Sequence, residues 1–125
     1  MSGQEVFEQA MRLLHYDDQL TTAEGQRSTR LQSQGLSAVN QIYSDLWHLE
    51  QDQPFCPLSA LSDALRLSPR LQRDVCPYGV AMLLAAAEAD GESQSVMASL
   101  YEQKRRCAAA PARRRIDVLP GRWGT

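Results

Sequence analysis

Apolar residues recur every three or four positions along most of the chain, and this spacing predicts a mainly α-helical protein. The clearest helix is expected to begin at Ser28 or Thr29 and to reach about Glu50, because its apolar positions keep steps of three and four. It should follow a polar loop over residues 17–27. An earlier helix is expected over residues 3–16, on a similar apolar stripe, and Ser2 and Glu5 have the spacing of a capping box at its start.

Proline marks the boundaries in the middle of the chain. Pro54 and Pro57 interrupt the helical spacing, so residues 52–68 are expected to form an extended loop or a short hairpin laid over the core. The pair Ser68-Pro69 has a capping residue followed by proline, which is typical of a helix start, and Pro77 marks another.

Two closely packed helices are expected after this point. The first, over residues 78–89, is rich in small residues, and it should end at Asp90-Gly91 with Gly91 in the left-handed conformation. The second is expected to begin at Ser93 and to end over residues 108–111. Its buried face should consist of four apolar residues: Val96, Met97, Leu100 and Tyr101.

These elements predict a small bundle of about four helices with an extended C-terminal segment. The helical domain should cover residues 1–110, and a basic extended tail should cover residues 111–125. At 125 residues, the chain is long enough for one compact domain.

Charge is also divided unevenly along the chain, at a boundary a few residues earlier. Residues 1–103 hold 6 basic and 14 acidic side chains, and residues 104–125 hold 7 basic side chains and one acidic. The net charge of −2 is therefore the sum of −8 on residues 1–103 and +6 on residues 104–125. An acidic body with a basic tail favours contact with copies of itself, with an acidic partner or with nucleic acid.

The tail combines basic and apolar residues without a helical period, so we expect it to dock on a partner subunit. A disordered end is the alternative. The arginine run at 113–115 is open to three interpretations: salt bridges to protein, contact with phosphates, or a solvated tail. The residues expected to bind the partner are Arg113, Arg114, Arg115, Ile116, Val118, Leu119, Arg122 and Trp123.

No catalytic, metal or cofactor site is expected, and the protein is not expected to be an enzyme. The chain has no phosphate loop, nucleophile elbow or zinc-protease motif. Its three cysteines lack the spacing of a zinc site, and His15 lies near Asp17 and Asp18 only in sequence. No apolar run is long enough to span a membrane, and the N-terminus lacks signal-peptide features, so we expect residence in the cytoplasm of the cell that makes the protein.

Four stretches within residues 30–106 carry a resemblance to a known family. They are Leu36-x-x-Val39-Asn40-x-x-Tyr43-x-Asp45-Leu46, Phe55-x-Pro57-Leu58-x-x-Leu61-x-Asp63, Asp74-Val75-x-Pro77-Tyr78-Gly79-Val80-Ala81-x-Leu83-Leu84-Ala85 and Leu100-Tyr101-x-x-Lys104-Arg105. This pattern resembles the head-to-tail connector, or adaptor, proteins encoded in the structural gene block of tailed phages and prophages.

The resemblance implies a structural virion protein in the neck below the portal, made in the host cytoplasm. Its implied partners are the portal protein, neighbouring copies in a ring of about twelve, a tail or stopper protein, and packaged DNA that passes through the channel, with no membrane. A small-residue helix face is expected to pack against the neighbouring subunit, through Ala81, Ala85 and Ala89. The alternatives are another neck or tail-completion protein, or a small DNA-binding regulator that acts through the arginine-rich tail.

Overall fold

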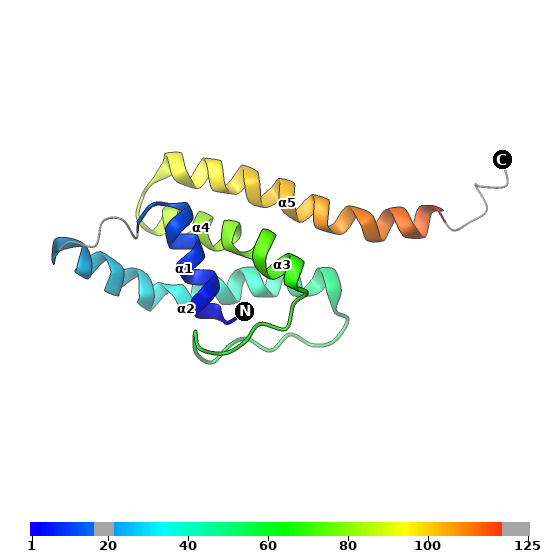
Figure 1. The fold of residues 1–125 in the computed structure, drawn as a ribbon, viewed down its shortest axis with the longest axis horizontal. Coiled ribbons are helices and arrows are strands. Elements are labelled where there is room, and N and C mark those ends of the chain that lie inside the picture. The colour runs from blue at the N-terminus through cyan, green and yellow to red at the C-terminus, as the bar shows by residue number, and fades with distance from the viewer. Residues whose placement is uncertain (17–21, 119–125) are drawn as a thin grey trace.

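The computed structural model describes the backbone of residues 1–16 and 22–118, and the side chains of residues 1–16 and 31–109. Figure 1 shows an arrangement of helices, with a long loop that follows the second of them. The helices are α1 (Gly3–Leu13), α2 (Thr22–Glu50), α3 (Pro69–Asp74), α4 (Cys76–Ala87) and α5 (Gly91–Val118). The prediction of a mainly α-helical bundle is therefore confirmed.

Helix α4 lies at the centre of the bundle. It packs against α1, α2 and α5, and its side chains Val80 and Leu84 are fully buried. Leu46 of α2 and Val6 of α1 are buried in the same core. A helix that is apolar on nearly all sides suits this central position, because each of its faces meets another helix.

Helix α1 begins with the capping box that the sequence predicts. The hydroxyl of Ser2 accepts a hydrogen bond from the N–H of Glu5 at 3.2 Å, and the carboxylate of Glu5 accepts one from the N–H of Ser2 at 3.1 Å. Phe7 on this helix packs where α2 carries Gly35. A Cβ atom at Gly35 would lie 2.8 Å from Cδ1 of Phe7, so this close approach of the two helices requires glycine.

Helix α2 begins at Thr22, six or seven residues before the expected start at Ser28 or Thr29. The polar loop expected over residues 17–27 is therefore wrong for residues 22–27, and residues 17–21 lie outside the described part of the chain. The reason lies in the composition of this segment. Ala, Glu, Gln and Arg are among the strongest helix formers, and they extend a helix even without an apolar stripe.

The connection between α2 and α3 is an extended loop, the less regular of the two forms expected for residues 52–68. In the described residues the only β-type pairing is an isolated bridge between Ser2 and Ala64. Ser68 then caps α3 by accepting the N–H of Leu71 at 3.4 Å, as expected from Ser68-Pro69.

The turn between α4 and α5 differs from the predicted one. Ala89, not Gly91, takes the left-handed conformation, with φ of 57°. Asp90 accepts the N–H of Ser93 at 3.2 Å, and α5 begins at Gly91 instead of Ser93. An aspartate is a strong helix N-cap, so it starts α5 two residues earlier than the sequence reading placed it.

Helix α5 is longer than expected and packs on a narrower face. Its backbone is helical to Val118, so the predicted end at 108–111 is wrong. Alanine and arginine favour the helix strongly enough to continue it through one proline. Met97 and Tyr101 are buried as predicted, but Val96 is 51% exposed, because α5 meets the body on one side only. None of the helices in the described residues is long and apolar enough to cross a membrane.

Candidate partner-binding surfaces

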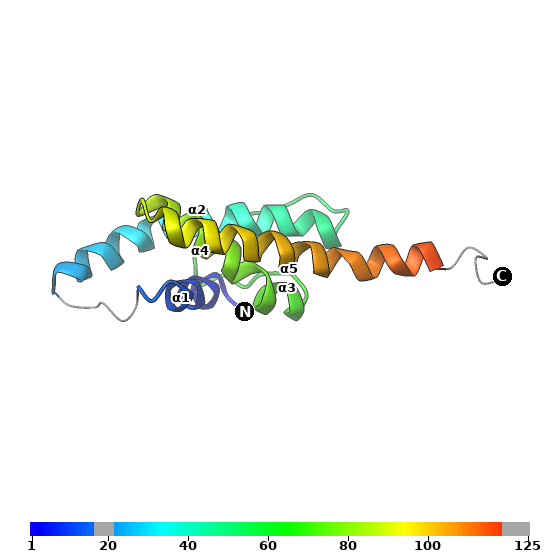
Figure 2. The ribbon, with the colours of Figure 1, turned by 90° about the horizontal axis from the view of Figure 1, so that it is seen from above.

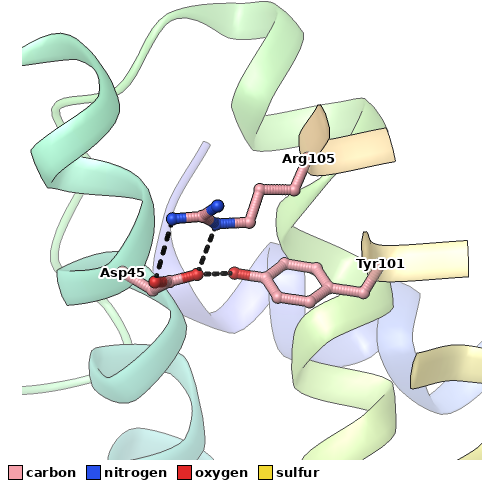
Figure 3. A network of polar contacts seen from close by, with 3 residues as sticks. All are labelled: Asp45, Tyr101 and Arg105. Atoms are coloured by element: carbon pink, nitrogen blue, oxygen red, sulfur yellow. Dashed lines mark hydrogen bonds and ion pairs between the residues drawn. The ribbon is translucent and has the colours of Figure 1, made fainter. Parts of the chain in front are cut away.

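A polar cluster fixes α5 to α2 (Figure 3). The phenol of Tyr101 donates a hydrogen bond of 2.5 Å to Oδ2 of Asp45. The guanidinium of Arg105 donates to both oxygens of the same carboxylate, at 2.8 Å from Nε and 3.3 Å from its second nitrogen. A guanidinium that grips both carboxylate oxygens restricts orientation as well as distance, so this cluster sets the direction in which α5 runs.

Burial decides the chemical state of Tyr101. The pKa of its phenol is raised far above the ordinary value, first by burial and then by its hydrogen bond to Asp45 and the charge of that carboxylate. The positive charge of Arg105 lowers this pKa only in part. The phenol therefore keeps its proton and remains a donor to Asp45. The ion pair between Arg105 and Asp45 is partly exposed, so solvent screens it and reduces its contribution to stability.

Two further contacts hold the same section of α5. Gly79 of α4 lies directly beneath Tyr101, and a Cβ atom there would come within 2.7 Å of the ring and 2.8 Å of Ile42. One turn further along α5, the ammonium of Lys104 lies 4.7 Å from the centre of the Tyr78 ring, within reach of a cation–π interaction. The helix is thus attached to both α2 and α4.

Beyond this attachment α5 continues away from the body, as Figures 1 and 2 both show. We call residues 106–118 of this helix the arm. Two hollows lie where the arm leaves α2 and α3. One, of about 480 Å³, includes Leu49, Leu71 and Ala108, and the other, of about 300 Å³, includes Lys104 and Ala108. Ala108 lies between these hollows and packs against the edge of the core, so the start of the arm is partly covered by the body.

The loop over residues 51–68 is held by one face of α2. Four side chains of α2 that carry polar groups lie three, four and three residues apart, and they form hydrogen bonds with the loop backbone. The bonds are Asn40 to the N–H and C=O of Leu58 (2.7 and 3.0 Å), Trp47 to the C=O of Gln53 (2.7 Å), the N–H of Arg66 to Tyr43 (3.0 Å), and the N–H of Ser68 to Glu50 (2.9 Å). This spacing is visible in the sequence. It is the signal from which the attachment of the loop to α2 could have been predicted.

A groove runs between the middle of α2 and the second half of α4. Its volume is about 500 Å³, and among the side chains that the structure describes, none that lines it carries a formal charge. They are Ser33, Gln34, Ser37, Ala38, Gln41, Leu83, Leu84, Ala86 and Ala87. We call this the uncharged groove; sequence reasoning did not identify it.

The small-residue face expected to contact a neighbouring subunit is used inside the chain. Ala81 and Ala85 are fully buried in the core, so neither is available to a second copy. Their small size serves the close packing of α4 against its neighbours. Ala89 is exposed, but it lies in the turn between α4 and α5 and not on a helix face.

The residues expected to bind a partner fall at and beyond the end of α5. Five of them lie on the helical backbone of the arm: Arg113, Arg114, Arg115, Ile116 and Val118. The other three lie outside the described residues: Leu119, Arg122 and Trp123. The structure thus places the basic run at the far end of a helix that projects from the body.

The cysteines have different environments. Cys76 is buried in the core, and burial raises the pKa of its thiol to about 12. Cys56 and Cys107 are exposed, and all three thiols are free. Among the described residues, no three His, Cys, Asp or Glu side chains converge to hold a metal ion.

Comparisons of the chain with protein-family models, with curated protein sequences and with solved structures found no match. The features that bear on its function therefore come from this structure alone. They are the arm, the hollows beside it, the loop over residues 51–68 that α2 holds, and the uncharged groove.

Proposed function

We propose that the protein is a structural subunit of a phage-type virion, a head-to-tail connector that binds the portal and joins the DNA-filled capsid to the tail. The observation that supports this most is the arm. A helix clamped to the body by Tyr101 and Arg105 carries a basic segment away from it. Such a helix presents its far end to another molecule at a fixed direction.

The charge distribution supports the same role. The body over residues 1–103 carries −8, and residues 104–125 carry +6. An acidic surface facing a channel repels passing DNA and keeps it from sticking, while a basic extension is drawn to acidic surfaces. A connector needs both properties, because it must hold protein partners while DNA slides past.

The firm attachment of α5 is useful for assembly. When one contact of a subunit forms, a stiff arm keeps the second binding site close to its target, which raises the effective concentration of that contact. We therefore place neighbouring copies in a ring, the portal, and a tail or stopper protein among the partners. The site of action is the virion neck, after synthesis in the host cytoplasm.

Native mass spectrometry of the protein with purified portal tests this proposal. We expect the full chain to join the portal in a complex of several copies. Deletion of residues 111–125 should abolish the complex because it removes the end of the arm and the tail. A matched pair of variants separates charge from shape: replacing Arg113, Arg114 and Arg115 by lysine should keep binding, and replacing them by glutamate should abolish it. A full chain that stays monomeric and ignores the portal contradicts the proposal.

Two other functions share part of this support. A different neck or tail-completion protein would use the same arm on another partner, and it would bind purified tail proteins instead of the portal. A DNA-binding regulator is favoured by the arginine run at 113–115. It would bind duplex DNA as a monomer or dimer, and its affinity would fall steeply between about 50 and 200 mM salt as phosphate contacts are screened.

A further inference from the structure

Basic residues gather where α3 meets α5, although the rest of the body is acidic. Residues 66–74 hold one acidic and three basic side chains, the latter being Arg66, Arg70 and Arg73. The other residues up to position 103 hold three basic and 13 acidic side chains. Helix α3 packs against α5, whose residues 104–106 add three more cations. Positive charge is therefore concentrated on one part of an otherwise acidic body.

The cations of this region are not all neutralised by the protein itself. Arg70 and Arg73 are exposed, and within the described part of the chain neither forms an ion pair. Lys104 contacts an aromatic ring but no carboxylate there. By contrast, Arg105 on the same helix is held by Asp45. Exposed cations without a partner in their own chain attract an anionic partner.

The two hollows at the start of the arm lie among these cations. Arg70 borders both hollows, and Lys104 borders the smaller one. Each hollow also has one carboxylate, Asp74 in the smaller and Glu50 in the larger, and that of Glu50 accepts the N–H of Ser68. Much of the remaining lining is apolar, through Leu49, Leu71, Val75, Leu100, Ala108 and Ala109. We call α3 together with these two hollows the α3–α5 face.

We infer that the α3–α5 face binds an acidic segment of another protein, one that carries apolar side chains beside its carboxylates. The apolar side chains enter the hollows, and the carboxylates pair with Arg70, Arg73 and Lys104. An amphipathic helix with glutamates along the edge of its apolar stripe has this form. Burial of the apolar side chains supplies affinity, and the charge pairs fix the orientation of the segment.

Other partners fit this face less well. A nucleic acid offers phosphates to the arginines, but its backbone has no apolar side chains to fill the hollows. A second copy of this chain offers little apolar surface, because Val96 is the one large apolar side chain that is exposed among the described residues. The C-terminal residues 104–125 of a second copy carry +6 and would be repelled by the same cations.

This inference goes beyond the connector proposal. It assigns binding to α3 and to the base of the arm, whereas the proposed portal contact uses the far end of the arm. It rests on the hollows and the unpaired cations, and it holds whether or not the acidic partner belongs to a virion.

Two exposed thiols allow a footprint of this face without any substitution. Cys107 borders the smaller hollow, and Cys56 lies on the loop between α2 and α3. N-ethylmaleimide modifies exposed thiols, and mass spectrometry of a digest gives the rate at each position. The probe is a synthetic helical peptide with leucines at steps of three and four and glutamates beside them.

The bound peptide should slow modification of Cys107 by about fivefold or more, at a peptide concentration well above its dissociation constant, and leave Cys56 unchanged. Cys56 is thus an internal control in the same molecule. Equal slowing of both thiols overturns the inference. No slowing of Cys107 at peptide concentrations up to about 1 mM overturns it as well.

A matched pair of variants tests the role of charge. Arg70→Glu reverses the charge that borders both hollows, so it should abolish the protection of Cys107. Arg12→Glu reverses an exposed arginine on α1 and should leave the protection within about twofold of the parent. Thermal unfolding checks that both variants are folded. Protection that persists in Arg70→Glu, or that is lost equally in both variants, overturns the inference.

Further probes identify the chemistry of the partner. A peptide with lysine in place of each glutamate, and one with serine in place of each leucine, should each protect Cys107 at least about tenfold less well. Equal protection by a short DNA duplex would indicate a nucleic-acid site and overturn the inference. Protection that rises with protein concentration in the absence of peptide would indicate a second copy as the occupant and overturn it too.

Failure of this inference and failure of the proposed function are distinguishable. If Cys107 is not protected and the protein still joins the portal, the α3–α5 face is not an acidic-peptide site and the connector function stands. If Cys107 is protected as expected and the portal is ignored, the α3–α5 face binds as inferred and the connector function is wrong.

Discussion

The phenol of Tyr101 donates a hydrogen bond of 2.5 Å to the carboxylate of Asp45, which lies 56 residues earlier on α2. Arg105 binds the same carboxylate one turn further along α5. The cluster lies at the point where α5 leaves the body, so it links the stability of the bundle to the direction of the arm (Figure 3).

Replacing Asp45 should destabilise the fold. We expect Asp45→Ala to lower the free energy of unfolding by about 1–3 kcal/mol, because it leaves the buried phenol of Tyr101 without its acceptor. Urea denaturation measures this change. In the Asp45→Ala background, Tyr101→Phe should cost less than it does alone, which a double-mutant cycle would report as coupling.

An exposed ion pair on the same helix provides the control. Glu102 pairs with Arg106 at 2.9 Å, and both side chains are more than 70% exposed. Glu102→Ala should change the free energy of unfolding by no more than about 0.5 kcal/mol. Equal losses in Asp45→Ala and Glu102→Ala would show that the cluster is no more than a surface ion pair.

The loop over residues 51–68, which is held by side chains of α2, gives a second prediction. The side chain of Asn40 bonds both the N–H and the C=O of Leu58. Asn40→Ala should lower the free energy of unfolding by about 1–3 kcal/mol, since both loop groups lose their partner. Asn40→Asp keeps the acceptor and loses the donor, so its effect should be smaller. Hydrogen exchange at the amide of Leu58 should be fast in the alanine variant and remain slow in the aspartate variant; fast exchange in both would contradict this assignment.

Elements whose signal is local were predictable from the sequence. The capping box at Ser2 and Glu5 and the helix start at Ser68-Pro69 follow from neighbouring residues alone, and the structure confirms both. The buried face of α5 was only partly predictable. A stripe of four apolar residues fits a helix covered on a broad face, but α5 meets the body along a narrow one, so Val96 remains exposed.

Features that depend on packing were not predictable. The face that includes Ala81 and Ala85 looks the same in sequence whether it meets a second copy or the core of its own chain, and only the central position of α4 decides. The uncharged groove is likewise formed by residues far apart in sequence, on α2 and α4. The extent of the arm was missed for another reason. Helix propensity continues α5 without the apolar periodicity that marks a packed helix.

Two glycines should respond oppositely to alanine. A Cβ atom at Gly79 would meet Tyr101 at 2.7 Å and Ile42 at 2.8 Å, so Gly79→Ala forces α5 away from α4. We expect a loss of about 1–3 kcal/mol, as is usual for overpacked cores. Gly91 has nothing within 4 Å of its Cβ position, and Gly91→Ala should leave stability unchanged or raise it by up to about 1 kcal/mol. Similar values for the two variants in urea denaturation would contradict the close approach at Gly79.

Alkaline pH should weaken the fold through Cys76. Burial raises the pKa of this thiol from 9.0 to about 12, so between these values the unfolded chain loses a proton that the folded chain keeps. The stabilisation is fully present below pH 9 and falls by about 1.4 kcal/mol for each pH unit above it. The raised pKa of Tyr101 acts in the same direction from its ordinary value of 10 upward.

Urea denaturation between about pH 8 and pH 11 measures this slope. Cys76→Ala removes the thiol, so its stability should fall less steeply with pH than that of the parent chain, whatever its stability at pH 8. Parallel slopes for the two proteins would show that the thiol titrates normally in the folded state.

Removing the end of the arm should separate assembly from folding. Among the described side chains, every buried apolar residue lies between Val6 and Tyr101, so a chain that ends at Ala110 keeps the whole of this core. We expect its free energy of unfolding to stay within about 0.5 kcal/mol of the full chain, while it no longer joins the portal or other copies. A chain that ends at Leu100 loses Tyr101 and Arg105, and it should be less stable by more than about 2 kcal/mol. Asp45 loses both of its partners, and the space beside Gly79 that the Tyr101 ring fills is left empty. If the chain ending at Ala110 were as unstable as the one ending at Leu100, the end of α5 would belong to the fold itself, and its loss could not be used as a test of partner binding.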